Sequence, residues 1–250
     1  LDGLPPLPAL TSVVLRACPV EDLAALGALP TLHTLELAYL NHLRTLRGLA
    51  GSGSLSRLEL RSCGRLPSLV GLPHGASLEH VSVHDCAVLA ELSGLPPQTL
   101  RSLTIGWCDS LPNLNLLPRL PVIARLDVDS CALIPSAPPA DRLPALVDLR
   151  MRRCVGLRDL RPLRGATALS RLSLAANPHL RDLTGLDDLP ALTTVDLRGC
   201  SQLTDLSTIG RLPNLRHLLL ADTGLRTDSV PAEWAGVANF SRTATVDDAG

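Results

Sequence analysis

Residues 192–200 read Leu-Thr-Thr-Val-Asp-Leu-Arg-Gly-Cys, and residues 55–63 read Leu-Ser-Arg-Leu-Glu-Leu-Arg-Ser-Cys. Both match the pattern L-x-x-L-x-L-x-x-C, and ten copies of this kind follow one another along the chain, with Leu40, Asn177 and Thr223 in the last position of the three that lack cysteine. The copies begin, 22 or 23 residues apart, at Leu10, Leu32, Leu55, Leu78, Leu100, Ile123, Leu146, Leu169, Leu192 and Leu215. All seven cysteines occupy the ninth position of a copy. Such regular spacing indicates a repeat protein.

Each copy has two halves, whose apolar residues recur with different periods. In the first half they alternate, as in Leu58-Glu59-Leu60, which is the period of a short strand with one buried face. In the second half they recur at every third residue, as in residues 203–212, which suits a 3₁₀-like turn better than an α-helix. A proline precedes most of the strands, and it marks their boundaries because proline cannot lie in a central strand.

A repeat of this length cannot bury its own apolar residues, so neighbouring copies must stack. In a stack the strands pair in parallel about 4.8 Å apart, and the leucines of successive copies form one continuous core. The bulkier return segments lie outside and curve the stack. We therefore predict an α/β solenoid of ten repeats, a horseshoe with a parallel concave β-sheet and 3₁₀ or irregular convex segments.

With this pattern the chain resembles the leucine-rich repeat family over residues 1–223. The resemblance rests on L-x-x-L-x-L-x-x-N/C repeated ten times, and the short repeats are similar to those of plant disease-resistance receptors. The family usually carries asparagine at the ninth position, where the side chain bonds to neighbouring backbone. Cysteine in its place predicts a more apolar row, because a thiol is a weak donor and a good small hydrophobe.

The first domain, residues 1–223, is predicted to be the solenoid. Residues 1–9 match residues 23–31, so the sequence opens in the middle of a repeat. A solenoid needs polar caps on its terminal repeats. We therefore expect an upstream part in the full protein.

The second domain, residues 224–250, is predicted to be a C-terminal capping helix followed by a loose tail. Pro231 favours a helix start at that position. Trp234, Val237 and Phe240 recur at spacing three, and we expect them to cover the last core layer.

Composition argues against two classes of partner. A net charge of −1 and a pI near 6.7 provide no field that would attract a nucleic-acid backbone. No stretch reaches the roughly 18 apolar residues of a membrane span, and no signal peptide is evident. We expect a cytoplasmic protein that binds neither nucleic acid nor membrane.

The cysteines are predicted to be reduced structural thiols. Their number is odd, and all are expected to point into the core. Parallel side chains in register do not meet with the dihedral angle that a disulfide requires. No C-x-x-C pair occurs, so we expect no metal site and no cofactor.

Function can be argued for one surface, the concave side, which the third, fifth and seventh positions of each copy face. His80, Ser82 and His84 share this face, and Cys86 follows them. The two histidines are separated by about 13 Å of strand, too far to share one zinc ion. Cys86 is expected to point into the core, so we expect no catalytic residue here.

From the sixth copy onward, opposite charges occupy equivalent positions on neighbouring strands. The expected neighbours are Asp127 with Arg150, Asp129 with Arg152, and Asp148 with both Arg125 and Arg171. Such pairs commonly solvate a sheet face, and we interpret them as structural. Arg153 and Arg198 have no evident partner and are candidates for recognising an acidic group.

Aromatic residues are rare, and two of them, Tyr39 and Trp107, fall at the exposed eighth position. Exposed aromatics beside charge are enriched in binding hot spots, although an amphipathic residue over a loop edge is also a normal structural outcome. Polar residues of the second to fifth copies are less obviously paired than those further along. The predicted partner-binding site consists of Tyr39, Trp107, Glu36, Glu59, Arg61 and His84.

We predict a recognition module that binds a protein ligand on its concave face, and we expect no enzyme activity. A composition rich in alanine, arginine, glycine and proline is typical of many soil bacteria. The resemblance then implies the C-terminal sensor and autoinhibitory region of a bacterial NLR-like immune NTPase, active against phage. There the repeats restrain an upstream NACHT or NB-ARC domain of the same chain. The alternative is an adaptor or secreted effector that selects a partner protein for a catalytic domain elsewhere.

Overall fold

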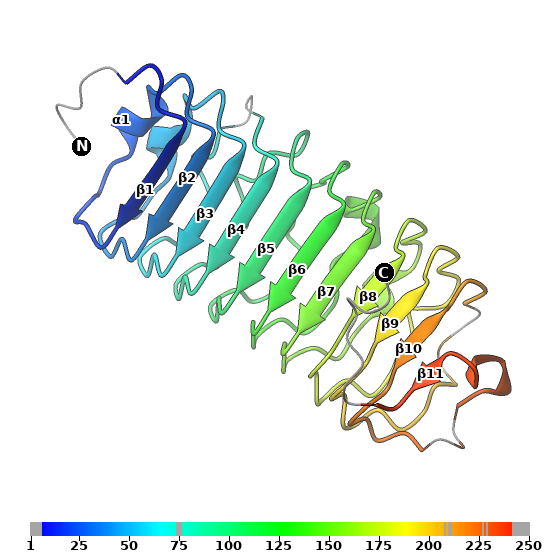
Figure 1. The fold of residues 1–250 in the computed structure, drawn as a ribbon. Coiled ribbons are helices and arrows are strands. Elements are labelled where there is room, and N and C mark those ends of the chain that lie inside the picture. Colours follow the sequence, from blue (N-terminus) through cyan, green and yellow to red (C-terminus); the bar gives the residue numbers. More distant parts are fainter. Residues whose placement is uncertain are drawn as a thin grey trace. The chain divides into compact units, whose positions relative to one another are not determined.

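The chain forms a parallel β-solenoid of leucine-rich repeats in the computed structural model, which describes residues 7–73, 77–207, 209, 212–226, 228 and 230–241. Each copy contributes one strand and one return segment (Figure 1). The chain divides into two compact units, Leu1–Pro112 with Leu116–Ile123, and Asn113–Asn115 with Ala124–Gly250. The predicted repeat solenoid with a parallel sheet is confirmed.

The strands pair in parallel and in register within each unit. The first unit contains β1 Ser12–Arg16, β2 Thr34–Ala38, β3 Arg57–Arg61, β4 His80–His84 and β5 Ser102–Gly106. The second contains β6 Arg125–Asp129, β7 Asp148–Arg152, β8 Arg171–Ser173, β9 Thr194–Asp196, β10 His217–Leu219 and β11 Ala238–Asn239. Leu58 of β3, for example, lies between Leu35 of β2 and Val81 of β4. Equivalent positions of successive copies therefore form straight rows.

The return segments contain short helical turns. These are α1 Ala24–Gly27 and the 3₁₀ turns η1 Arg47–Leu49, η2 Ala140–Arg142 and η3 Arg161–Leu163. Leu203, Leu206 and Ile209, spaced three apart, are all buried. Residues 203–206 are irregular and do not form a 3₁₀ turn, so this return segment keeps the three-residue spacing of its buried side chains without a helix.

The core lies on one face of each strand and the open face lies on the other. In β3, Leu58 and Leu60 are fully buried, whereas Arg57, Glu59 and Arg61 reach solvent. Leucine rows from the return segments close the core from the opposite side. The term "open face" is used below for the side of the sheet that carries the third, fifth and seventh positions.

The eighth position of every copy adopts a left-handed backbone conformation, which the sequence analysis did not predict. These residues are Ala17, Tyr39, Ser62, Asp85, Trp107, Ser130, Arg153, Ala176, Gly199 and Asp222, with φ between 50° and 74°. Their amides extend the hydrogen-bond ladder past the strand, as where the Tyr39 N–H donates to the Arg61 carbonyl at 2.8 Å. The left-handed residue ends the strand and directs the ninth side chain inward, at a conformational cost that only glycine escapes.

This backbone conformation predicts how the eighth position tolerates substitution. Ala176 is exposed and has a φ of 59°. Asparagine visits the left-handed region readily and β-branched residues do not, so we expect Ala176→Val to lower the free energy of unfolding by about 1 kcal/mol. Ala176→Asn should leave it nearly unchanged. Urea denaturation of the two variants measures the difference, and equal stabilities would contradict the assigned conformation.

The cysteine row is buried and bonded to backbone. Six of the seven free cysteines are buried, as predicted, but Cys18 of the first copy is half-buried. The Cys200 thiol donates to the Leu174 carbonyl at 3.2 Å, and the Asn177 amide donates to the Met151 and Leu174 carbonyls at 2.7 and 2.6 Å. The thiol therefore occupies the place of the asparagine amide and bonds to equivalent carbonyls, with a weaker hydrogen bond.

We expect thiol labelling of the native protein to modify Cys18 first and the other six only on unfolding. Burial raises the pKa of Cys108 and Cys154 to about 11 and that of Cys200 to about 12, so little thiolate forms at neutral pH. A hydrogen bond with the Cys63 thiol raises the pKa of Cys86. Ellman's reagent with and without denaturant measures this, and Cys18→Ser should remove the fast phase. Several fast equivalents in that variant would contradict the buried row.

The predicted C-terminal helix is limited to one 3₁₀ turn, η5 Ala232–Trp234. The chain then extends into β11, which pairs with β10. This strand satisfies backbone groups at the edge of β10, because the Leu218 and Leu220 amides donate to carbonyls of Val237 and Asn239, bonds that a helix would not provide. Of the three residues expected to cover the last core layer, Trp234 is buried, whereas Val237 and Phe240 are half-buried. The predicted loose tail after residue 241 lies outside the described residues.

Candidate functional site

Two parallel rows of polar side chains cover the open face of the first unit. The third-position row is Thr34, Arg57, His80 and Ser102, and the fifth-position row is Glu36, Glu59, Ser82 and Thr104. Neighbours within a row are one strand spacing apart, about 4.8 Å. The in-register stacking of the copies thus places polar groups from β2 to β5 on one continuous surface.

A shallow polar pocket of about 230 Å³ lies between these rows on β3, β4 and β5. Among the residues that the structure describes, the hydroxyls of Ser82, Ser102 and Thr104 and the guanidinium of Arg57 have no hydrogen-bond or ion-pair partner. His80 also lines the pocket, 4.0 Å from the Glu79 carboxylate. The pocket therefore offers donors and acceptors that a ligand can use without breaking a bond within the protein.

The acidic residues of the predicted site are paired. Arg16 contacts Glu36 at 2.7 Å, and Arg61 forms an ion pair with Glu59 on its own strand. Glu36 and Glu59 are neighbours in register, and each like charge is balanced by its own arginine. Glu36, Glu59 and Arg61, which were predicted to be less obviously paired, therefore all have ion-pair partners.

Trp107 and His84 form the aromatic part of the candidate site. Their ring centroids are 6.1 Å apart with an interplanar angle of 47°. Trp107 is 51% exposed because its left-handed backbone turns the side chain away from the core at the end of β5. His84 belongs to the open face of β4, so Trp107 continues the polar surface toward the carboxyl ends of the strands.

Tyr39 lies apart from the other predicted residues. It is 57% exposed at the end of β2 and borders a small pocket of about 240 Å³ with Cys18 and His42. Three strand spacings, roughly 14 Å, separate its backbone from that of Trp107. The six predicted residues thus form an ion-paired row, an aromatic pair and one separate tyrosine.

The histidines of β4 and the buried cysteine that follows it do not form a metal centre with other described residues. His80 and His84 share the open face of β4, as predicted, and Cys86 is buried beneath it. Within the described ranges, no group of three or more His, Cys, Asp or Glu residues is arranged to hold a metal ion. The described helices include none that is long and apolar enough to cross a membrane.

The open face of the second unit carries an interlocked set of ion pairs. The predicted strand neighbours are confirmed by the register of β6, β7 and β8. Arg152 contacts Asp127 at 3.3 Å and Asp129 at 3.8 Å, and Arg150 contacts Asp148 at 3.2 Å. Asp129 and Asp148 are buried.

Arg153 and Arg198 were expected to lack partners, and this expectation is wrong. Arg153 pairs with Asp129, and Arg198 contacts Asp196 at 2.8 Å. The missed contacts are diagonal or lie two residues apart on one strand, which is within reach of an arginine side chain. They remove both residues as candidates for recognising an external acidic group.

The structure adds four residues to the candidate site: Arg57, Ser82, Ser102 and Thr104. Their positions in the repeat could be read from the sequence, since all four fall at third or fifth positions. The repeat pattern does not show which of these polar side chains form hydrogen bonds or ion pairs within the protein. Such bonds depend on side-chain conformation, which the repeat does not determine.

No protein-family model and no curated protein matches the chain. Among solved structures it is similar to the internalin inlF of Listeria monocytogenes, with 18% identity over 89% of this chain and 72% of that one and a TM-score of 0.49. It is also similar to the leucine-rich repeat domain of the type III effector XopL, with 21% identity over 84% of this chain and 78% of that one and a TM-score of 0.43. A leucine-rich repeat protein of Leptospira interrogans is 17% identical over 89% of this chain and 69% of its own, with a TM-score of 0.36. These likenesses concern the fold alone.

Proposed function

We propose that the chain is a recognition module that binds a protein partner on the open face of β2 to β5. The observation that carries this proposal is the pocket where Arg57 and three hydroxyls have no partner among the described residues. Trp107 adds an exposed aromatic side chain at the end of the same surface. Hot spots of protein interfaces are enriched in tryptophan and arginine, and both residue types are present here.

The chemistry of this surface suits an extended polypeptide segment with an acidic side chain. Hydroxyls of Ser82, Ser102 and Thr104 can donate to and accept from peptide groups, and Arg57 can form a two-pronged bond with a carboxylate. The groups stand on a paired parallel sheet, so binding orders few side chains. In the second unit, by contrast, the open-face arginines Arg150, Arg152 and Arg198 are each bonded to an aspartate of the protein.

Site-specific photo-crosslinking tests this proposal. A photoreactive amino acid at Ser82 should give one discrete cross-linked product with the partner in the producing cell, and Arg57→Ala or Trp107→Ala should abolish it. The matched control carries the photoreactive group at Leu116, an apolar side chain 76% exposed on a return segment. Equal products from Ser82 and Leu116 would contradict binding at the open face.

As biological context we propose a cytoplasmic sensor and autoinhibitory domain of a bacterial NLR-like immune NTPase. Support comes from the resemblance of the repeats to those of plant disease-resistance receptors and from cysteines used as buried free thiols. Full-length protein should then contain an upstream G-x-x-x-x-G-K-[ST] loop, whose absence would reject this context. Trp107→Ala should abolish protection against phage, while Leu116→Ala should retain it.

A further inference from the structure

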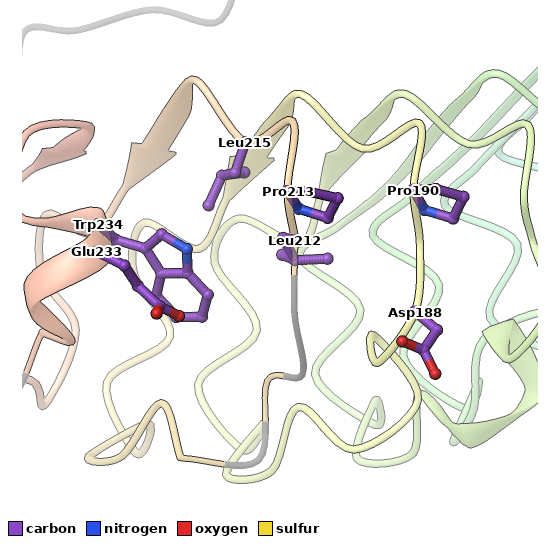
Figure 2. Close-up of a pocket in the computed structure, with 7 residues that line it drawn as sticks. All are labelled: Asp188, Pro190, Leu212, Pro213, Leu215, Glu233 and Trp234. Atoms are coloured by element: carbon purple, nitrogen blue, oxygen red, sulfur yellow. The ribbon is translucent and has the colours of Figure 1, made fainter.

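A second pocket, of about 690 Å³, lies in the second unit beside the C-terminal 3₁₀ turn η5 (Figure 2). It is lined by five apolar residues, Pro190, Leu212, Pro213, Leu215 and Trp234. Two acidic residues, Asp188 and Glu233, also line it. The labelled side chains come from the return segments of the eighth and ninth copies, from Leu215 at the start of the tenth copy and from η5, so the pocket shares no residue with the proposed partner-binding surface.

The pocket lies where, within the described residues, the regular stacking of return segments gives way to η5. Leu189 and Leu192 of the preceding copy are fully buried, whereas their equivalents Leu212 and Leu215 are 4% and 9% exposed. Trp234 approaches these leucines from η5, but the space between the return segments and the turn stays open (Figure 2). The result is an apolar wall that solvent can reach.

Two carboxylates give the apolar wall a negative charge. Neither Asp188 nor Glu233 has a hydrogen bond or ion pair with another residue in the part of the chain that the structure describes. Asp188 has a φ of 57°, a conformation that its short polar side chain tolerates and that turns the chain next to Pro190. Both carboxylates are exposed, so each remains able to bind a cation.

We propose that this pocket binds a basic side chain, arginine or lysine, presented by an extended peptide of a partner protein. The aliphatic stem lies on Pro190, Pro213 and the two leucines, as long basic side chains commonly do on apolar surfaces. The cationic group is held by Glu233, which lies beside Trp234 in Figure 2, and a cation–π contact with the indole adds to the attraction. Asp188, at the Pro190 end of the pocket, adds to its negative charge. Charge and shape together select a cation with an apolar stem over a neutral apolar group.

Trp234 provides a direct optical test. The chain has two tryptophans, so a Trp107→Phe background leaves Trp234 as the single reporter. Titration with the blocked tripeptide acetyl-leucyl-arginyl-leucine amide should change its fluorescence with a Kd below about 1 mM, a modest value suited to one anchored side chain. The matched citrulline tripeptide, of equal shape without the charge, should bind at least tenfold more weakly.

Two variants complete the test. The double variant Asp188→Asn, Glu233→Gln should also weaken the arginine tripeptide at least tenfold, and asparagine preserves the left-handed backbone at position 188. Asp109→Asn, which removes one negative charge from the first unit, should leave binding unchanged. Equal affinity for the arginine and citrulline peptides would show that the pocket is only an apolar groove and would overturn the proposal. The absence of a fluorescence response at 10 mM arginine peptide would also overturn it.

If the double variant fails to fold, the comparison of the two peptides on the Trp107→Phe protein still tests the proposal. Failure here leaves the open-face proposal intact, because the two sites share no residue.

Discussion

Leu172→Ala is expected to lower the free energy of unfolding by about 2–5 kcal/mol, the range for a buried leucine truncated to alanine. Leu172 is 1% exposed and lies in β8 between Leu149 of β7 and Val195 of β9, both fully buried. Leu149 and Val195 are held in paired strands, so the surrounding structure cannot easily collapse into the cavity. The variant therefore does not recover most of the van der Waals contacts that the Leu172 side chain makes in the parent protein.

Urea denaturation followed by circular dichroism measures this effect, with hydrogen exchange of the β8 amides as a local readout. The local readout matters because repeat arrays can unfold in more than one step. Leu133→Ala is the matched control, since Leu133 is a leucine that is 57% exposed. A loss below about 0.5 kcal/mol for Leu172→Ala would mean that the strand register is wrong, because such a value is typical of surface sites.

Arg152→Ala is expected to destabilise the second unit by about 2 kcal/mol at neutral pH, because it leaves the partly buried carboxylate of Asp127 without the guanidinium that bonds to it. Arg152 bonds to Asp127 and also contacts Asp129, whose side chains are 16% and 11% exposed. Arg161→Ala is the control, because its partner Asp159 lies at the surface and such pairs contribute little. Equal losses for the two variants would contradict a structural role for the ion-pair set.

The loss caused by Arg152→Ala should shrink in acid. Burial raises the pKa of Asp127, while the charge of Arg152 acts to lower it. Removing Arg152 therefore raises the pKa of Asp127 further. A carboxylate whose folded pKa exceeds its unfolded value destabilises the fold above that pKa, and protonation relieves the cost. The difference from the parent chain should decrease between neutral pH and about pH 4, where unperturbed aspartates titrate. A difference independent of pH would contradict this account.

The strand positions and the core could be predicted because the repeat assigns each residue a position whose burial is the same in most copies. Leu58 and Leu60 alternate with Glu59, and the same alternation recurs in the other copies, which identifies the buried face and the register together. Residues 231–240 have no equivalent in other copies. Their strand β11 forms because β10 has an edge to pair, a tertiary effect that local helix signals around Pro231 do not contain.

The candidate site was predicted less well, for a physical reason. Register indicates which side chains are neighbours across strands, and it correctly placed Asp127 beside Arg150. Arginine, however, is long enough to choose among several carboxylates, and Arg150 contacts Asp148 on its own strand. The partner of a flexible charged side chain depends on competition among nearby groups, so pairing could not be read from the repeat alone.

At the left-handed residue that ends each strand, the requirement on the backbone is independent of the requirement on the side chain. The backbone must adopt the left-handed conformation, but the side chain points away from the core and does not contribute to its packing. The ten copies place alanine, tyrosine, serine, aspartate, tryptophan, arginine and glycine there. Substitutions that avoid β-branching can therefore change what this edge of the solenoid recognises while the scaffold persists. Variation across relatives should concentrate in this column, where new specificity arises at little cost to folding.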